Sequence, residues 1–176
     1  MNNKEALSSI QNIFKIYFEA LSTYSEKEFF YKSDSNTWSL AQMYEHVCSS
    51  SKFFFLANTK RCLEKRNGQE GGLMNSKGEG LFKNGGFPSD LKVKVPEKVA
   101  SVIIGKEATY YLSEIKEIIL SAIDLESLLV QDEGTYKIEH PVFGFLNAEE
   151  WFRSLEMHSR HHLKQKEGLE ALAKNA

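Results

Sequence analysis

The sequence predicts an all-α protein: a four-helix bundle with a long connection between the second and third helices. Four segments, of about 20 to 27 residues each, place apolar side chains three and four positions apart, which keeps them on one face of an α-helix. A glycine-rich stretch separates the second of these segments from the third. No segment alternates polar and apolar residues for long enough to predict a half-buried β-strand.

Size and composition predict one globular domain spanning residues 1–176. A chain of 176 residues can bury a substantial core, and 41% apolar and 26% charged residues are ordinary values for such a domain. The net charge of −2 gives no electrostatic reason to expect binding to nucleic acid or to an anionic membrane.

The cellular compartment is predicted from the cysteines and from missing targeting signals. No apolar run reaches the length of about 20 residues that spans a bilayer, and the first residues lack the apolar centre of a signal peptide. Cys48 and Cys62 fall on one predicted helix, roughly 20 Å apart, which is too far for a disulfide. Free thiols without an export signal indicate a reducing compartment, so we expect a cytoplasmic protein.

The first two helices are predicted over residues 4–24 and from Ser39 to about residue 65. Ser39 and Gln42 form a capping box, in which each side chain accepts a hydrogen bond from the other residue's backbone N–H. His46 lies on the flank of the apolar stripe of the second helix. That stripe comprises Leu40, Met43, Val47, Ser50, Phe54 and Ala57.

The connection between the second and third helices is predicted over residues 66–98. Seven of the eleven glycines lie between Gly68 and Gly86, and two of the three prolines follow. We expect no helical periodicity here, and connections of this length in compact domains are usually functional or mobile. The third helix is predicted over residues 105–129.

The fourth helix, predicted over residues 147–173, carries polar side chains where its apolar stripe should continue. The stripe reads Trp151, Leu155, His158, His162, Gln165 and Leu169. Burying such polar groups costs free energy unless each finds a partner. Two imidazoles at positions i and i+4 can converge on one metal ion at about 2.0–2.1 Å. Half-buried histidines bonded to Tyr, Glu or water are the alternative, and the spacing leaves both interpretations open.

His46 is the natural third ligand, because it faces inward from another helix. Three histidines would leave an open coordination position, which is typical of catalytic rather than structural zinc sites. Imidazoles also suit nickel and iron(II). Gln165 is expected either to hold a ligand imidazole or a metal-bound water, or to reach solvent. His140, which precedes a proline, is expected to be structural or exposed.

Several segments together resemble the DinB-like (YfiT-like) superfamily. They are Trp38-Ser39-Leu40-Ala41-Gln42-Met43-Tyr44-Glu45-His46, then His140-Pro141-Val142-Phe143-Gly144 with Asn147-Ala148-Glu149-Glu150-Trp151, and finally the H-x-x-x-H-x-x-Q pattern from His158 to Gln165. The ordered set carries the resemblance rather than any one motif. One departure is His161, where the family frequently has arginine.

The resemblance implies a four-helix bundle with a divalent ion, usually zinc or nickel, on His46, His158 and His162. It also implies a homodimer, which the family often forms. Its characterised branches are thiol-dependent enzymes, including maleylpyruvate isomerase and S-transferases that use bacillithiol, mycothiol or glutathione.

Our functional hypothesis is a metal-dependent thiol S-transferase. Its cofactor would be a low-molecular-weight thiol, deprotonated at the ion, and its substrate a small electrophile held beneath the 66–98 connection. A metal-dependent hydrolase is one alternative, with metal-bound water as the nucleophile. A non-catalytic metal-binding or stress-related bundle is another, and a bundle whose histidines bind no metal is the third.

Overall fold

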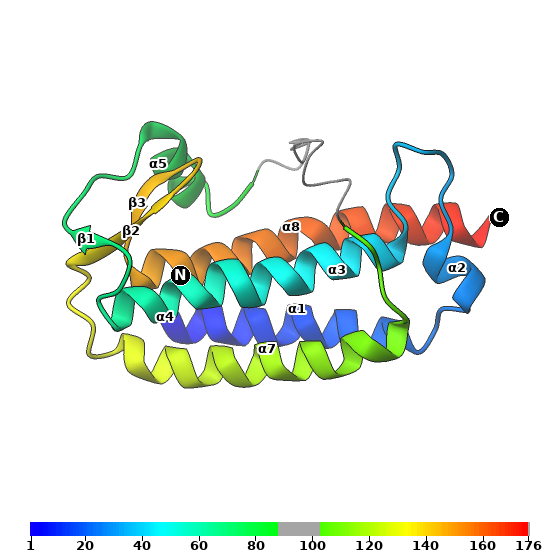
Figure 1. Ribbon diagram of the computed structural model, residues 1–176, viewed down its shortest axis with the longest axis horizontal. Coiled ribbons are helices and arrows are strands. Elements are labelled where there is room, and N and C mark those ends of the chain that lie inside the picture. Colours follow the sequence, from blue (N-terminus) through cyan, green and yellow to red (C-terminus); the bar gives the residue numbers. More distant parts are fainter. Residues whose placement is uncertain (88–102, 176) are drawn as a thin grey trace.

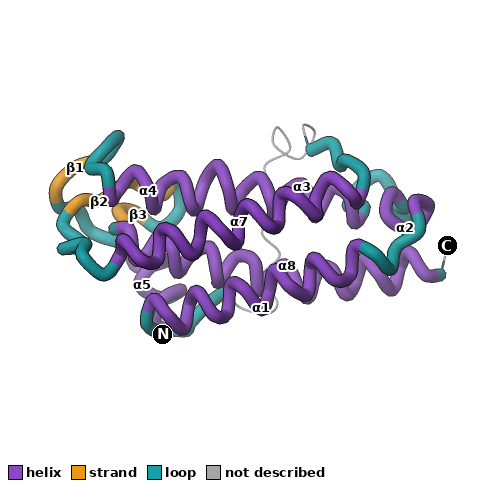
Figure 2. Tube along the Cα trace, turned by 90° about the horizontal axis from the view of Figure 1, so that it is seen from below, coloured by secondary structure: helices purple, strands orange, loops and turns teal. Residues whose placement is uncertain are grey.

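The computed structural model describes residues 1–87 and 103–175. Helical rods lie lengthwise beside one another and form a bundle, as Figures 1 and 2 show from two directions. The rods are α1 (Asn3–Leu21), a second rod composed of α3 (Leu40–Ser50), η1 (Ser51–Leu56) and α4 (Ala57–Leu63), then α7 (Ala108–Leu129) and α8 (Ala148–Lys174). The predicted four-helix bundle is confirmed. None of the described helices is both long and apolar enough to cross a membrane.

Capping boxes begin the two rods that carry the candidate histidines. The Ser39 hydroxyl accepts from the backbone N–H of Gln42 at 3.2 Å, and the Gln42 side chain accepts from Ser39 at 3.1 Å. Asn147 and Glu150 make the same pair of bonds at the start of α8. These boxes satisfy N–H groups that would otherwise lack partners, so both starts could be predicted from sequence.

The first helix ends at Leu21, three residues before the predicted end at residue 24. The hydroxyls of Ser22 and Thr23 donate to the carbonyls of Glu19 and Ala20. Such side-chain bonds compete with the helical pattern and favour its end.

A small antiparallel sheet and two short helices were not predicted. The sheet has the order β1 (Gln69–Glu70), β2 (Tyr136–His140) and β3 (Gly144–Leu146), with Ile138 paired to Leu146. It covers one end of the bundle, and α2 (Glu26–Phe30) lies at the other (Figure 1). The third unpredicted element is α5 (Ser76–Lys83).

The prediction that residues 66–98 lack a helix is wrong over α5. The Asn75 side chain caps this helix by accepting from the N–H groups of Lys77 and Gly78. A Cβ on Gly78 would come within 2.8 Å of the Phe143 carbonyl oxygen, so this glycine allows close packing against the β2–β3 hairpin. Residues 88–98 of the predicted connection lie outside the described part of the chain.

In the second rod, the residues that face the core differ from those of the predicted apolar stripe. Ser50, Phe54 and Ala57 are only half-buried, whereas the residues one position later are buried: these are Ser51, Phe55 and Asn58. The shift occurs because Ser51–Leu56 is a π-helix, which closes its hydrogen bonds over one more residue than an α-helix. One additional residue is thereby accommodated without interrupting the rod.

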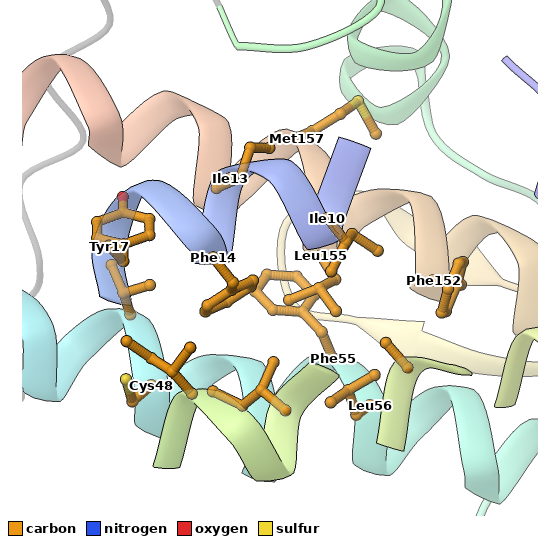
Figure 3. Close-up of a cluster of buried hydrophobic side chains, with 14 of the residues drawn as sticks. Ile10, Ile13, Phe14, Tyr17, Cys48, Phe55, Leu56, Phe152, Leu155 and Met157 are labelled. Carbon is orange, nitrogen blue, oxygen red and sulfur yellow. The ribbon is translucent and has the colours of Figure 1, made fainter. Parts of the chain in front are cut away.

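Apolar side chains from all the rods fill the centre of the bundle. Figure 3 shows Phe14 of α1, Phe55 of η1 and Leu155 of α8 gathered between the helices. The buried Tyr17 hydroxyl donates to the backbone carbonyl of Ser159 at 2.9 Å, and so ties α1 to α8. Ser159 comes between His158 and His162 in the sequence of α8, so this core contact helps to fix the helix that carries them.

Candidate metal centre

Three histidine side chains from two rods converge at one point. His46 comes from α3, and His158 and His162 come from α8. The Nε2 atom of His46 lies 3.1 Å from that of His158 and 3.2 Å from that of His162, and the last two are 3.2 Å apart. The three nitrogens therefore form a nearly equilateral triangle.

The triangle has the size that one metal ion requires. Nitrogens at about 2.05 Å from an ion lie about 3.3 Å apart at tetrahedral angles and about 2.9 Å apart at right angles. The observed 3.1–3.2 Å falls between these values. A neutral imidazole has one N–H to donate, so three clustered Nε2 atoms cannot all satisfy one another. These three histidines are therefore close enough, and suitably arranged, to hold one ion.

Gln165 lies within hydrogen-bond distance of one ring nitrogen of His162. Its Oε1 atom lies 2.6 Å from Nδ1 of His162, one helical turn away on α8. An amide oxygen only accepts hydrogen bonds, so a bond between these two atoms requires the proton on Nδ1, and in that tautomer Nε2 keeps a free lone pair directed at the triangle. Of the two expectations for Gln165, the structure places its side chain on the imidazole rather than in solvent.

Burial keeps all three imidazoles neutral near pH 7. It lowers the pKa of His46 to about 4 and that of His162 to about 3, because a charged ring loses hydration inside the protein. The pKa of His158 also lies well below its ordinary value, first through burial and then through the neighbouring His162 and His46. Neutral imidazole is the form that binds a metal ion.

Aromatic rings surround the triangle. Each histidine has one further aromatic ring with a centroid within 5.3 Å; the pairs are Trp38 with His46, Phe55 with His158 and His161 with His162. The sequence missed Phe55, because a regular α-helix would have turned Phe54 inward instead. The run Ser49-Ser50-Ser51 is a signal of irregularity, since serine hydroxyls bond to carbonyls of the preceding turn.

The other histidines do not join the cluster. His140 is buried, and its Nδ1 accepts from the N–H groups of Val142 and Phe143, which closes the turn between β2 and β3. It has the structural role that was one of its two expectations. His161 packs against Phe87, with ring centroids 5.3 Å apart. Within residues 1–87 and 103–175, no second group of three His, Cys, Asp or Glu ligand atoms comes as close together.

Fold and site thus define a four-helix bundle with a three-histidine cluster that could hold a metal ion. No protein-family model and no curated protein sequence matches the chain. A solved structure does: the crystal structure of TT2238, a four-helix bundle protein, superposes with a TM-score of 0.59 at 16% sequence identity. The match covers 95% of this chain and 99% of that chain, and at this identity it supports the fold alone.

Proposed function

We propose that this protein is a divalent-metal-binding bundle of the DinB-like kind, with His46, His158 and His162 as its metal ligands. The observation that carries the proposal is the triangle of Nε2 atoms with sides of 3.1–3.2 Å. An all-imidazole donor set fits zinc and nickel, the metals most often found in the family that the sequence resembles.

We further propose that the site transfers a low-molecular-weight thiol to a small electrophile. A coordinating thiol is deprotonated outright, so the ion when bound supplies a thiolate near neutral pH. Three protein ligands leave room for such an external ligand. The chain's own thiols do not suit this role, because Cys48 and Cys62 are buried and burial raises the pKa of each, that of Cys62 to about 12.

The residues of the chain hold and orient the reactants in this scheme. Neutral His46, His158 and His162 provide the donor atoms, and Gln165 keeps the His162 tautomer fixed. In the transfer itself, the thiol S–H bond breaks and its proton leaves to solvent. A bond forms between sulfur and the electrophilic carbon, and the leaving group departs with the electron pair of its bond to that carbon.

Metal binding is tested by adding zinc or nickel to metal-free protein and measuring the metal retained after excess is removed. We expect about one ion per chain for the wild type and a loss in His162→Ala. His161→Ala, which changes a neighbouring histidine outside the triangle, is the matched control and should retain the ion. Retention of less than about 0.2 ion per wild-type chain with both metals would overturn the proposal.

Transferase activity is tested with the metal-loaded protein, a small chromogenic electrophile, and bacillithiol, mycothiol or glutathione. We expect thiol-dependent consumption of the electrophile that His162→Ala abolishes and His161→Ala retains. Consumption without any thiol would indicate a hydrolase. If metal binds but none of the three thiols supports a reaction, the transferase proposal fails and a non-catalytic metal-binding protein remains.

A further inference from the structure

The second rod changes its helical period directly after the turn that carries His46. The α-helix α3 gives way to the π-helix Ser51–Leu56, and the backbone on both sides stays in the right-handed helical region. At this change the Ser50 hydroxyl donates to the His46 carbonyl, and the Ser51 hydroxyl donates to the Val47 carbonyl, both at 2.6 Å. π-Helical turns are rare, and they occur frequently at functional sites.

The π-helix brings two residues onto one face that an α-helix would separate. His46 and Phe55 are nine positions apart, and nine residues of α-helix turn through about 900°, which places their side chains on opposite sides. A π-helix turns less per residue. In the structure both rings contact His158, with ring centroids at 5.0 Å for His46 and 4.9 Å for Phe55.

His158 also differs from His162 in how its ring is held. The Nδ1 atom of His162 is bonded to Gln165, whereas Nδ1 of His158 is buried and has no hydrogen-bond partner among the described residues. Metal-binding imidazoles are usually oriented by a hydrogen bond from the second ring nitrogen. For His158, packing must do this instead, and besides the candidate ligand His46 the ring against it from the second rod is Phe55.

We propose that Phe55 is a positioning residue for His158, brought into place by the π-helix Ser51–Leu56. Phe55 is buried, with 4% of its surface exposed, and its ring takes over the orienting role that Gln165 has for His162. The inference rests on the proposed function, because it assumes that His158 is a metal ligand.

Phe54 provides a matched control within the same π-helix. Its ring lies against His140 at 5.2 Å and against Trp151 at 5.0 Å. Phe55 also contacts Trp151, at 6.3 Å. Phe55→Leu and Phe54→Leu therefore remove the same ring from the same helix, but only the first removes the contact with His158.

The experiment measures zinc affinity by competition with a chromophoric chelator, together with the visible absorption of the Co²⁺-loaded protein. We expect Phe55→Leu to weaken zinc binding about 10-fold and to alter the Co²⁺ spectrum, as loss of an orienting contact does. Phe54→Leu should change affinity by less than about 2-fold and keep the wild-type spectrum. Equal effects of the two substitutions, or a wild-type spectrum in Phe55→Leu, would overturn the inference.

A second measurement does not depend on the variants folding. Proton NMR of metal-free wild-type protein should give nuclear Overhauser contacts from the Phe55 ring to the His158 ring, and contacts from Phe54 to His158 in their place would overturn the assignment. If the wild type binds neither Zn²⁺ nor Co²⁺, the proposed function fails, and the NMR contact still shows whether the Phe55 ring lies against the His158 ring.

Discussion

The side-chain oxygen of Gln165 lies 2.6 Å from Nδ1 of His162, one turn away along α8. As a hydrogen bond to an amide oxygen, this contact favours the tautomer with the proton on Nδ1, in which the lone pair of Nε2 faces His46 and His158.

Gln165→Leu should therefore weaken metal binding without unfolding the protein. Loss of the partner leaves the imidazole free to rotate or to change tautomer, and such losses typically cost about 10- to 100-fold in metal affinity. Gln165→Glu keeps an acceptor oxygen in place, so its affinity should stay closer to that of the wild type. The measurement is zinc competition with a chelator, and Lys164→Ala, at an exposed neighbouring position, is the control. Wild-type affinity in Gln165→Leu would show that the contact is incidental.

Much of the candidate site could be predicted because its signals are local. The capping boxes at Ser39 and Asn147 fixed where two rods begin. The four-residue spacing of His158 and His162 put both on one face of α8, as any α-helix requires. His46 lies before the π-helix, so the regular α-helical period placed it correctly on the flank of the stripe.

The features that were missed depend on an irregular helical period or on contacts between distant segments. Phe55 could not be found from periodicity, because the π-helix shifts every later position by one residue. The strand Tyr136–His140 is paired on both sides, by β1 and β3, and these partner strands, of two and three residues, are too short to show an alternating pattern. From the sequence, Gly78 was predicted to lie in a loop. It lies inside α5, where the chain packs closely against the β2–β3 hairpin.

His140 should make stability depend on pH even though it lies outside the triangle. Burial lowers its pKa from 6.5 to about 4, so between these values the unfolded chain binds a proton that the folded chain does not. Its stabilising contribution is complete above about pH 6.5 and is lost as the pH falls towards 4. Because Asn can still accept the backbone N–H groups but does not titrate, His140→Asn should remove this dependence.

The test is urea unfolding of metal-free wild type and His140→Asn at pH 7 and pH 5. The stability difference between wild type and variant should fall by about 2 kcal/mol over this interval, at about 1.4 kcal/mol per pH unit below 6.5. The three site histidines titrate in both proteins, so the effect of burial on their pKa values cancels in the comparison. His140 also lowers the pKa of His158, but it is the weakest of the causes acting there. A difference that does not change with pH would mean that His140 already carries a proton in the folded protein at pH 5.

Removal of the metal should leave the bundle folded. The core in Figure 3 is built from side chains such as Phe14, Phe152 and Leu155, which are buried without help from an ion. This differs from a zinc finger, whose fold depends on the metal. Zinc at about 100 times its dissociation constant should add about 2.7 kcal/mol to the free energy of unfolding, and EDTA should reverse the gain. Circular dichroism checks the prediction: metal-free protein should keep its helical signal and a cooperative transition, and His162→Ala should show little gain from zinc. A chain that loses its helices in EDTA would contradict this and would make the ion part of the fold.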